Sequence, residues 1–212
     1  MDIAGFDSVN EIDGQKRLSM DYDEYFGEMD LSEEEKEKRK VFSEELEKNI
    51  LFFFFLYQIA KAMDYEDEEF IKRQLEEKYQ ELVKNHIEID EKLENHILDF
   101  TNDIYETTKN HENDEWYFSN DRAVLTSENE SNCIFNYDEY RSAVLSGRKN
   151  KTWITMNDKR VRHTHRILDY KTIPINGVFL VGDSEMLFPK DESLGANMKE
   201  IANCRCTIKY FW

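Results

Sequence analysis

The sequence predicts an α+β fold, in which a long helical N-terminal region is followed by a small C-terminal α+β domain with a hairpin and a closing strand. Two observations lead to this prediction. Residues 28–146 contain neither glycine nor proline and are rich in Glu, Lys, Leu and Gln, which favours long helices. After Gly147, glycine and proline return and β-branched and aromatic residues cluster, which is typical of strands and turns.

Charge is unevenly distributed along the 212 residues, whose formal net charge is -18. Residues 1–150 carry 18 Lys and Arg against 39 Asp and Glu, whereas residues 151–212 carry 10 against 7. An acidic body repels nucleic acid and favours solubility or a basic protein partner, while a slightly basic tail suits phosphate or an acidic surface. The overall balance argues against a dedicated DNA-binding protein.

The three cysteines indicate a reducing compartment, because an odd number with one close Cys-x-Cys pair does not make a secreted disulfide framework. The N-terminus lacks the basic and apolar regions of a secretory signal. The most apolar run, Ile50–Tyr57 with phenylalanines at 52–55, is far shorter than the roughly 20 residues that span a bilayer. We expect a helix segment buried on several sides rather than a membrane-active wedge.

The helical region is predicted to follow an acidic arm over residues 1–30, which has no sustained period and orders on a partner. Ser32 and Glu35 form a capping-box signature that begins a first helix, which ends near residues 63–66. Its apolar stripe consists of Leu46, Ile50, Phe53, Phe54, Tyr57 and Ala60.

A second helical region is predicted from apolar residues spaced mostly three, four or seven apart. These residues are Phe70, Leu75, Tyr79, Leu82, His86, Leu93, Ile97, Phe100 and Ile104. Whether this region is one helix or two, with a break near Ile89-Asp90, is left open by the sequence. Residues 110–114 form a polar break. One further helix or a pair of helices then runs to Gly147, which suits a helix C-terminus.

The C-terminal strands are predicted from three segments. Residues 172–175 are extended because Pro174 restrains its neighbours. Residues 178–181 and 186–188 flank a Gly-Asp-Ser turn and indicate a hairpin. Residues 204–211 alternate between two faces as a closing strand, with Cys204, Cys206, Ile208 and Tyr210 on one of them.

One candidate site lies on a short helix predicted over residues 158–169. Arg162, His165 and Asp169 share one face of that helix, and Asp158 can pair with Arg162. In a nuclease or transferase, His165 acts as general base, Asp169 orients it, and Arg160 or Arg162 stabilises phosphate charge. The favoured alternative is a salt-bridge lattice that fixes the helix against the hairpin.

A second candidate site combines Cys204 and Cys206 with His165 and, in a fuller version, His163. Thiolate and imidazole ligands suit a tetrahedral zinc site. A single Cys-x-Cys without a matching C-x-x-C favours reduced buried thiols instead, and a disulfide is a third alternative. We therefore favour no metal and no other cofactor, and Cys133 is predicted to be a separate thiol.

A polar run precedes the C-terminal domain and comprises Glu128, Glu130, Asn132, Asn136 and Tyr137. We expect a solvated helix face; in the alternative, one carboxylate turns toward the arginines of the C-terminal domain. No Gly-rich phosphate loop, G-x-S-x-G elbow or H-E-x-x-H motif occurs in the sequence.

An ordered set of motifs carries a family resemblance. They are Trp153, Asp158-x-Arg160-x-Arg162-x-x-His165-x-x-Leu168-Asp169, Pro174, Phe188-Pro189-Lys190-Asp191, Leu194-Gly195 and Asn203-Cys204-Arg205-Cys206. This set resembles the C-terminal domain of phage Mu F-like minor head proteins, also called the phage head morphogenesis domain. Residues 128–132 and 137–147 are similar to the helix that precedes that domain, so the resemblance covers roughly residues 120–212.

The resemblance implies a low-copy protein of the capsid interior that acts in head morphogenesis or in genome packaging and delivery. Its expected partners are the portal or other capsid proteins, and packaged DNA through the basic residues of the tail, including Arg148, Lys149 and Lys151; no membrane is expected. The expected location is the virion, and the bacterial host cytoplasm during assembly. Members of the family are not established as enzymes.

The sequence departs from the family pattern at four positions. In some relatives a C-x-x-C pair occupies the positions of Arg162 and His165, and a histidine stands at the position of Ile201. Tyr170 stands where the family usually has glycine. The Arg162 and His165 form implies that ion pairing replaces a metal in this chain, and Tyr170 implies a different turn after Asp169.

The sequence thus predicts an arm over residues 1–30, a helical region over 31–118 and a minor-head domain over 119–212. The predicted function is that of a phage or prophage minor head protein. Two alternatives stay open: a metal-independent nuclease-type or nucleotidyl-modifying toxin that uses His165 and Arg162, and an acidic helical adaptor.

Overall fold

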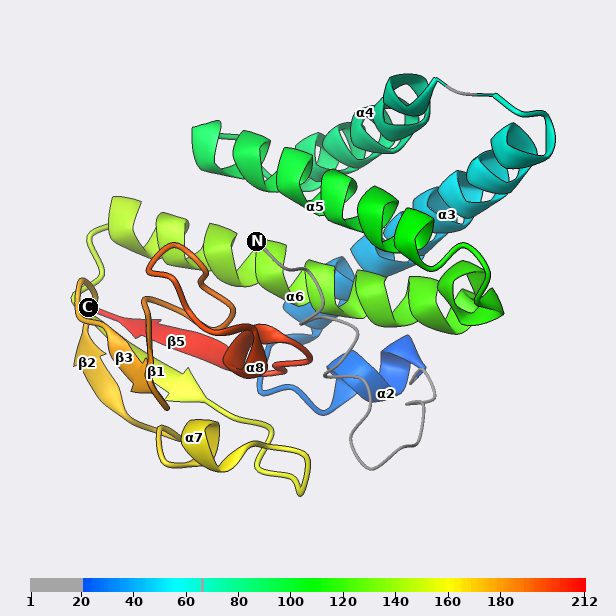
Figure 1. The fold of residues 1–212 in the computed structure, drawn as a ribbon. Coiled ribbons are helices and arrows are strands. Elements are labelled where there is room, and N and C mark those ends of the chain that lie inside the picture. The colour runs from blue at the N-terminus through cyan, green and yellow to red at the C-terminus, as the bar shows by residue number, and fades with distance from the viewer. Residues whose placement is uncertain (1–20, 66) are drawn as a thin grey trace. The chain divides into compact units, whose positions relative to one another are not determined.

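The computed structural model describes residues 21–65 and 67–212 and is mostly helical, with antiparallel strands near the C-terminus, so the α+β prediction is confirmed (Figure 1). The described residues form two compact units: residues 40–127 make up a helical unit, and residues 21–39 with 128–212 make up an α+β unit. The unit boundaries fall inside two long helices, and so differ from the boundaries expected at residues 30 and 118.

The helical elements are α2 (Tyr22–Gly27), α3 (Glu33–Ala62), α4 (Glu68–His86), α5 (Glu91–Asn110), the 3-10 helix η1 (Glu115–Phe118), α6 (Asn120–Leu145), α7 (His163–Arg166) and α8 (Met198–Ile201). The strands are β1 (Asn150–Ile154), β2 (Thr172–Pro174), β3 (Phe179–Val181), β4 (Ser184–Met186) and β5 (Thr207–Phe211).

Helix α2 corrects the expectation of a loose arm over residues 21–30. Asp21 caps this helix by accepting a hydrogen bond from the backbone N–H of Asp23 at 2.8 Å. Tyr25, Phe26 and Met29 are buried in the α+β unit, so apolar burial orders the segment. The rest of the expected arm, residues 1–20, lies outside the described residues.

The predicted start of α3 is confirmed by its capping box. The Ser32 backbone N–H donates to Glu35 Oε2 at 2.8 Å, and the Glu35 N–H donates to Ser32 Oγ at 3.3 Å. All six residues of the predicted apolar stripe are buried. The expectation that the phenylalanine run is buried on several sides is wrong for Phe52 and Phe55, which are 42% and 61% exposed.

Helices α4 and α5 form an antiparallel hairpin in the helical unit (Figure 1). The break that the sequence left open lies at residues 87–90, where Asp90 caps α5 by accepting from the Leu93 N–H at 3.0 Å. Aromatic contacts hold these helices in their unit: the Tyr79 and Phe100 ring centroids lie 4.7 Å apart, and those of Tyr57 and Tyr105 lie 5.9 Å apart.

Helix α6 is a single helix, and Gly147 follows it with a φ of +80°, a left-handed conformation that favours glycine. A three-stranded antiparallel sheet with the order β2-β1-β5 follows, and β3 pairs with β4 as the predicted hairpin. The turn between β3 and β4 requires Gly182, because φ is +60° there and an added Cβ would lie 2.8 Å from Glu200 Oε1.

The core of the α+β unit surrounds Trp153, whose ring contacts Phe179 at a centroid distance of 5.1 Å. The closing strand is shorter than predicted, because β5 begins at Thr207. Cys204 and Cys206 lie in the loop before it, and both are buried in this core. Cys204 and Cys206 therefore lie in the core but are not part of β5.

Candidate functional site

The structure brings His165, Cys204 and Cys206 together in the core of the α+β unit. His165 Nδ1 lies 3.5 Å from the Sγ atoms of both cysteines, and all three side chains are buried. The ring of Trp153 covers the imidazole edge-on at a centroid distance of 5.7 Å. This cluster, hereafter the His-Cys-Cys cluster, is the set of donors that the sequence offered as an alternative zinc site, although no metal was favoured.

The other imidazole nitrogen binds a carboxylate that the sequence did not indicate. His165 Nε2 lies 3.0 Å from Glu200 Oε2, which also accepts a hydrogen bond from Thr164 Oγ1 at 2.7 Å. The expected partner, Asp169, instead accepts from the Thr155 backbone N–H at 2.8 Å. The expected helix over residues 158–169 is reduced to the single turn of α7, so the face shared by His165 and Asp169 does not form.

The thiols and the imidazole shift one another's protonation. A hydrogen bond from Cys206, together with the nearby imidazolium, holds the pKa of the Cys204 thiol well below its usual range despite burial. Burial raises the pKa of Cys206. For His165, burial lowers the pKa, but the negative charge on Cys204 outweighs it and the net pKa is raised. The cluster can therefore hold a thiolate-imidazolium pair with Cys206 as donor.

The His-Cys-Cys cluster offers three of the four ligands that a structural zinc site requires. Within the described residues, His163 is exposed and outside the group of donor atoms, so it does not supply the fourth ligand. The guanidinium of Arg162 lies close enough to lower the pKa of His165, and a positive charge there disfavours a second cation. The donor chemistry suits zinc, but these residues do not complete a tetrahedral site.

The loop that carries the cysteines is held from the side of α7 by arginines. Arg205 is buried and paired with Asp158, and the Arg162 guanidinium donates to the Ala202 carbonyl. Burial raises the pKa of Asp158, but the Arg205 guanidinium and backbone N–H groups outweigh it, so the net pKa is lowered. The expected pairing of Asp158 with Arg162 is therefore wrong, because the arginine from the distant loop takes that place.

Helix α6 holds the same loop from the other side through three asparagines, spaced three and four residues apart. Asn132 Nδ2 donates to the carbonyls of Cys204 at 3.0 Å and Cys206 at 3.3 Å, and Asn136 Nδ2 donates to Cys206 at 3.1 Å. Asn129 Nδ2 donates to Asn203 Oδ1 at 2.7 Å. These amides satisfy carbonyls that burial would otherwise leave without a hydrogen-bond partner.

This arrangement corrects the expected solvated face of α6, because Glu128, Glu130, Asn132 and Asn136 are all buried. The amide side chains of Asn129, Asn132 and Asn136 reach toward the C-terminal segment. The 3-4 spacing of the asparagines was visible in the sequence and places them on one helix face. That spacing is the signal that could have found them; Glu200 left no comparable signal.

Lys151 is also placed differently from expectation. Its side chain is fully buried, and its Nζ lies 4.9 Å from the ring centroid of Tyr140 and 5.5 Å from that of Phe179. Burial lowers its pKa to about 8. Lys151 therefore cannot contact DNA from this position, and Arg148 stacks on the Trp212 ring at 4.2 Å.

The residues proposed for catalysis do not converge on a shared space. His165 is 1% exposed, Arg160 turns to Asp158 with its Nε 3.3 Å from Oδ2, and Asp169 binds the backbone at Thr155. Arg162 lies near enough to His165 to lower its pKa, against the larger effect of Cys204. The arrangement is a tied loop rather than an open cleft.

Comparison of the chain with protein-family models, with curated proteins and with solved structures found no match. Within residues 21–65 and 67–212, no helix combines the length and apolar character needed to cross a bilayer. The geometry of the site and the resemblance of its motifs are therefore the grounds for a functional proposal.

Proposed function

We propose that the protein is a minor head protein of a phage or prophage that associates with the portal or another capsid protein and acts in head morphogenesis or genome delivery. One observation supports this most strongly. The residues that carry the family resemblance lie far apart in sequence, yet Trp153, Asp158, His165 and the Asn203–Cys206 loop form one tied unit, in which Asp158 and Asn203 are half-buried and the other residues are buried. A motif set that forms a single structural unit fits an architectural role.

The burial of His165 favours this proposal over the toxin alternative. A general base must lie within hydrogen-bond reach of the substrate proton, and His165 has both ring nitrogens engaged within the core. Under the proposal, the thiolate-imidazolium pair and the Asp158–Arg205 pair keep the loop in place. The domain then presents a fixed surface inside the head.

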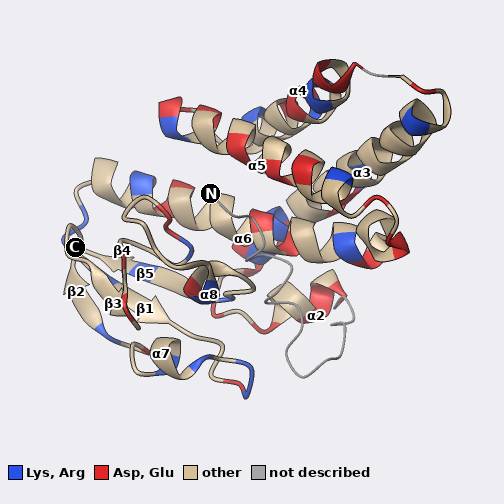
Figure 2. Ribbon diagram, viewed as in Figure 1, with Lys and Arg blue, Asp and Glu red and all other residues tan. Residues whose placement is uncertain are grey.

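Contact with packaged DNA is proposed through exposed cations instead of Lys151. Lys149, Lys159, Arg166 and Lys171 are exposed, and Figure 2 shows Lys and Arg on the segment around α7. Such binding should weaken steeply as salt increases. Protein binding releases the cations condensed on the DNA phosphates, and this release becomes less favourable as the salt concentration rises. Retention of DNA at high salt would argue against this electrostatic mode.

The test is purification of procapsids and mature particles from an induced or infected host that encodes the protein. We expect the protein to co-purify with portal-containing particles at low copy number, measured by quantitative mass spectrometry. Particles from a host with the gene deleted provide the control. Absence of the protein from wild-type particles at every assembly stage would refute the proposal.

The toxin alternative is tested by expression of the whole chain in a bacterial host. We expect no growth defect from the wild-type protein or from His165→Ala, with the amounts of soluble protein matched. A growth defect that His165→Ala relieves, together with cleavage of RNA or DNA, would establish the alternative.

A further inference from the structure

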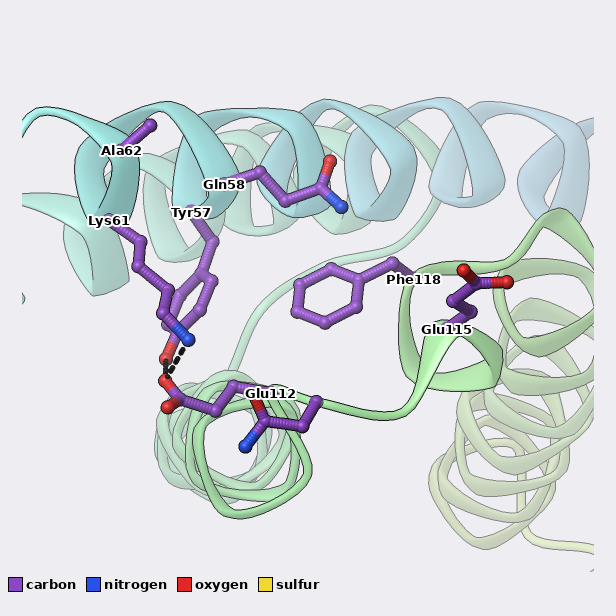
Figure 3. Close-up of a pocket in the computed structure, with 8 residues that line it drawn as sticks. Tyr57, Gln58, Lys61, Ala62, Glu112, Glu115 and Phe118 are labelled. Carbon is purple, nitrogen blue, oxygen red and sulfur yellow. Dashed lines mark hydrogen bonds and ion pairs between the residues drawn. The ribbon is translucent and has the colours of Figure 1, made fainter.

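A hollow of about 730 Å³ opens in the helical unit, between the end of α3 and η1. Its walls include Tyr57 and Lys61 from α3, Glu112 from the turn after α5, and Glu115 and Phe118 from η1. Figure 3 shows the Phe118 ring facing the hollow, with Glu112 and Glu115 on opposite sides of it. Tyr57 and Phe118 form the aromatic floor of the hollow, with their ring centroids 5.9 Å apart.

The polar groups of this hollow leave one carboxylate available. Lys61 Nζ lies 2.8 Å from Glu112 Oε2, and the Tyr57 hydroxyl lies 3.5 Å from the same oxygen. Burial, and then the Glu112 charge, raise the pKa of Tyr57 to about 12, so its hydroxyl stays protonated. Glu115 is exposed, and no described residue pairs with its carboxylate. The hollow therefore has a negative rim beside an aromatic floor.

An apolar stripe on the last turns of α3 and on Met63, the residue directly after this helix, adjoins the hollow. Phe55, Ile59 and Met63 follow one another at intervals of four residues, and they are 61%, 39% and 75% exposed. Gln58 and Ala62 line the hollow and stand three residues after Phe55 and Ile59, a spacing at which side chains are neighbours on a helix surface, so the stripe and the hollow share an edge. Exposed apolar side chains gathered beside a pocket mark an interaction surface.

Charge identifies the kind of occupant. Residues 40–127 contain 10 Lys and Arg against 22 Asp and Glu, and Figure 2 shows Asp and Glu distributed along α4 and α5. The C-terminus of α3 adds the negative end of a helix dipole next to the hollow. A second copy of this unit would bring a like charge and be repelled, whereas a basic segment would be attracted.

We propose that this hollow and the adjoining stripe of Phe55, Ile59 and Met63 dock an amphipathic, basic helix of a partner protein. Apolar side chains of that helix cover the stripe, and an arginine or lysine enters the hollow, stacks on Phe118 and pairs with Glu115. The identity of the partner as a head protein rests on the proposed function, but the surface and its chemistry do not.

The test uses the full chain and a fluorescent synthetic helical peptide with leucines on one face and arginines beside them. Fluorescence anisotropy at 150 mM salt should show binding to the wild-type protein. We expect Phe55→Ser and Glu115→Lys each to weaken binding by at least about tenfold, about 1.4 kcal/mol. Leu145→Ser, which changes a leucine that is 79% exposed outside this surface, should bind like the wild type.

Two results would overturn the inference. One is equal binding of the peptide by all four proteins, which would show attraction to the acidic surface as a whole. The other is no peptide binding together with a wild-type dimer in analytical ultracentrifugation that Phe55→Ser dissociates, which would show that a second copy covers the stripe.

Failure of this surface and failure of the proposed function give different outcomes. If Phe55→Ser and Glu115→Lys proteins still enter particles as the wild type does, the surface is wrong although the head function stands. If the wild type binds the peptide but is absent from particles, the surface stands without the head function.

Discussion

His165 and Glu200 join α7 to α8 across 35 residues of sequence, with Nε2 3.0 Å from Oε2. The carboxylate also accepts from Thr164 Oγ1 and lies against the Gly182 turn. One glutamate thus orients the imidazole that faces both thiols. A carboxylate in this position accepts from Nε2–H and fixes the orientation of the ring, as outer-shell carboxylates do for histidine ligands.

We expect Glu200→Ala to lower the free energy of unfolding by about 1 to 3 kcal/mol, because the substitution leaves a buried imidazole nitrogen and a hydroxyl without their acceptor. Glu200→Gln should cost less, since the amide oxygen still accepts from Thr164. Urea unfolding at pH 7 measures both, with the exposed Lys199→Ala as the control. Equal stability of Glu200→Ala and the control would show that this contact does not hold α7.

Asn132→Ala removes two hydrogen bonds to the cysteine loop. We expect a loss of about 1 to 3 kcal/mol in the free energy of unfolding, because the Cys204 carbonyl loses its amide donor in the core. Ser142→Ala, at an exposed position of the same helix, should change stability by less than about 0.5 kcal/mol. A loss no larger than that of the control would contradict the role assigned to α6.

Arg162→Cys should convert the His-Cys-Cys cluster into a zinc site, since a thiolate replaces a positive charge and completes a Cys3His donor set. We expect one zinc per chain in the variant, measured by a chromogenic chelator, and a higher melting temperature in excess zinc.

Arg166→Cys is the matched control for this prediction, because Arg166 is exposed on the same helix turn. It should bind no zinc of this kind, and the wild type should purify with much less than one zinc per chain. A stoichiometric zinc in the wild type would contradict the interpretation that ion pairing replaces the metal.

Lys151→Met should stabilise the fold at pH 7 by about 1 to 3 kcal/mol, because it removes a buried amine over Tyr140 and Phe179 that lacks a hydrogen-bond partner among the described residues. The pKa of Lys151 falls from 10.5 to about 8 on folding, so the unfolded state binds the extra proton between these values. Wild-type stability should therefore rise relative to the variant as the pH increases from 8 toward 10.5, with Asp191 partly offsetting the effect.

The measurement is the difference between the two unfolding free energies at pH 7, 8, 9 and 10. Taking the difference removes the contributions of the cysteines and tyrosines that both proteins share. A difference that stays constant over this range would contradict the burial of a charged amine.

Much of the secondary structure could be predicted because its signals are local. The Ser32–Glu35 capping box, the stripe from Leu46 to Ala60 and the turn at Gly182 each depend on residues within a few turns or one hairpin. Helical periodicity and glycine conformation depend on local sequence and little on the rest of the chain. The α+β class followed from these signals.

The candidate site was predicted in its members but not in its contacts. His165, Cys204 and Cys206 were expected together and do meet. Asp169 was expected beside His165, yet Glu200 takes that place, and Arg205 rather than Arg162 pairs with Asp158. Each replacement joins residues more than 30 positions apart, where no helical or strand period relates the two.

The sequence by itself determined the long helical region, the hairpin and the chemistry of the donor atoms, since these depend on residue type and short-range spacing. Tertiary structure alone decided that Lys151 is buried, that Phe55 is exposed, and that α6 amides hold the cysteine loop. The reason is that burial and long-range hydrogen bonding depend on which faces meet in the folded unit. A periodic pattern identifies a face but does not say what covers it.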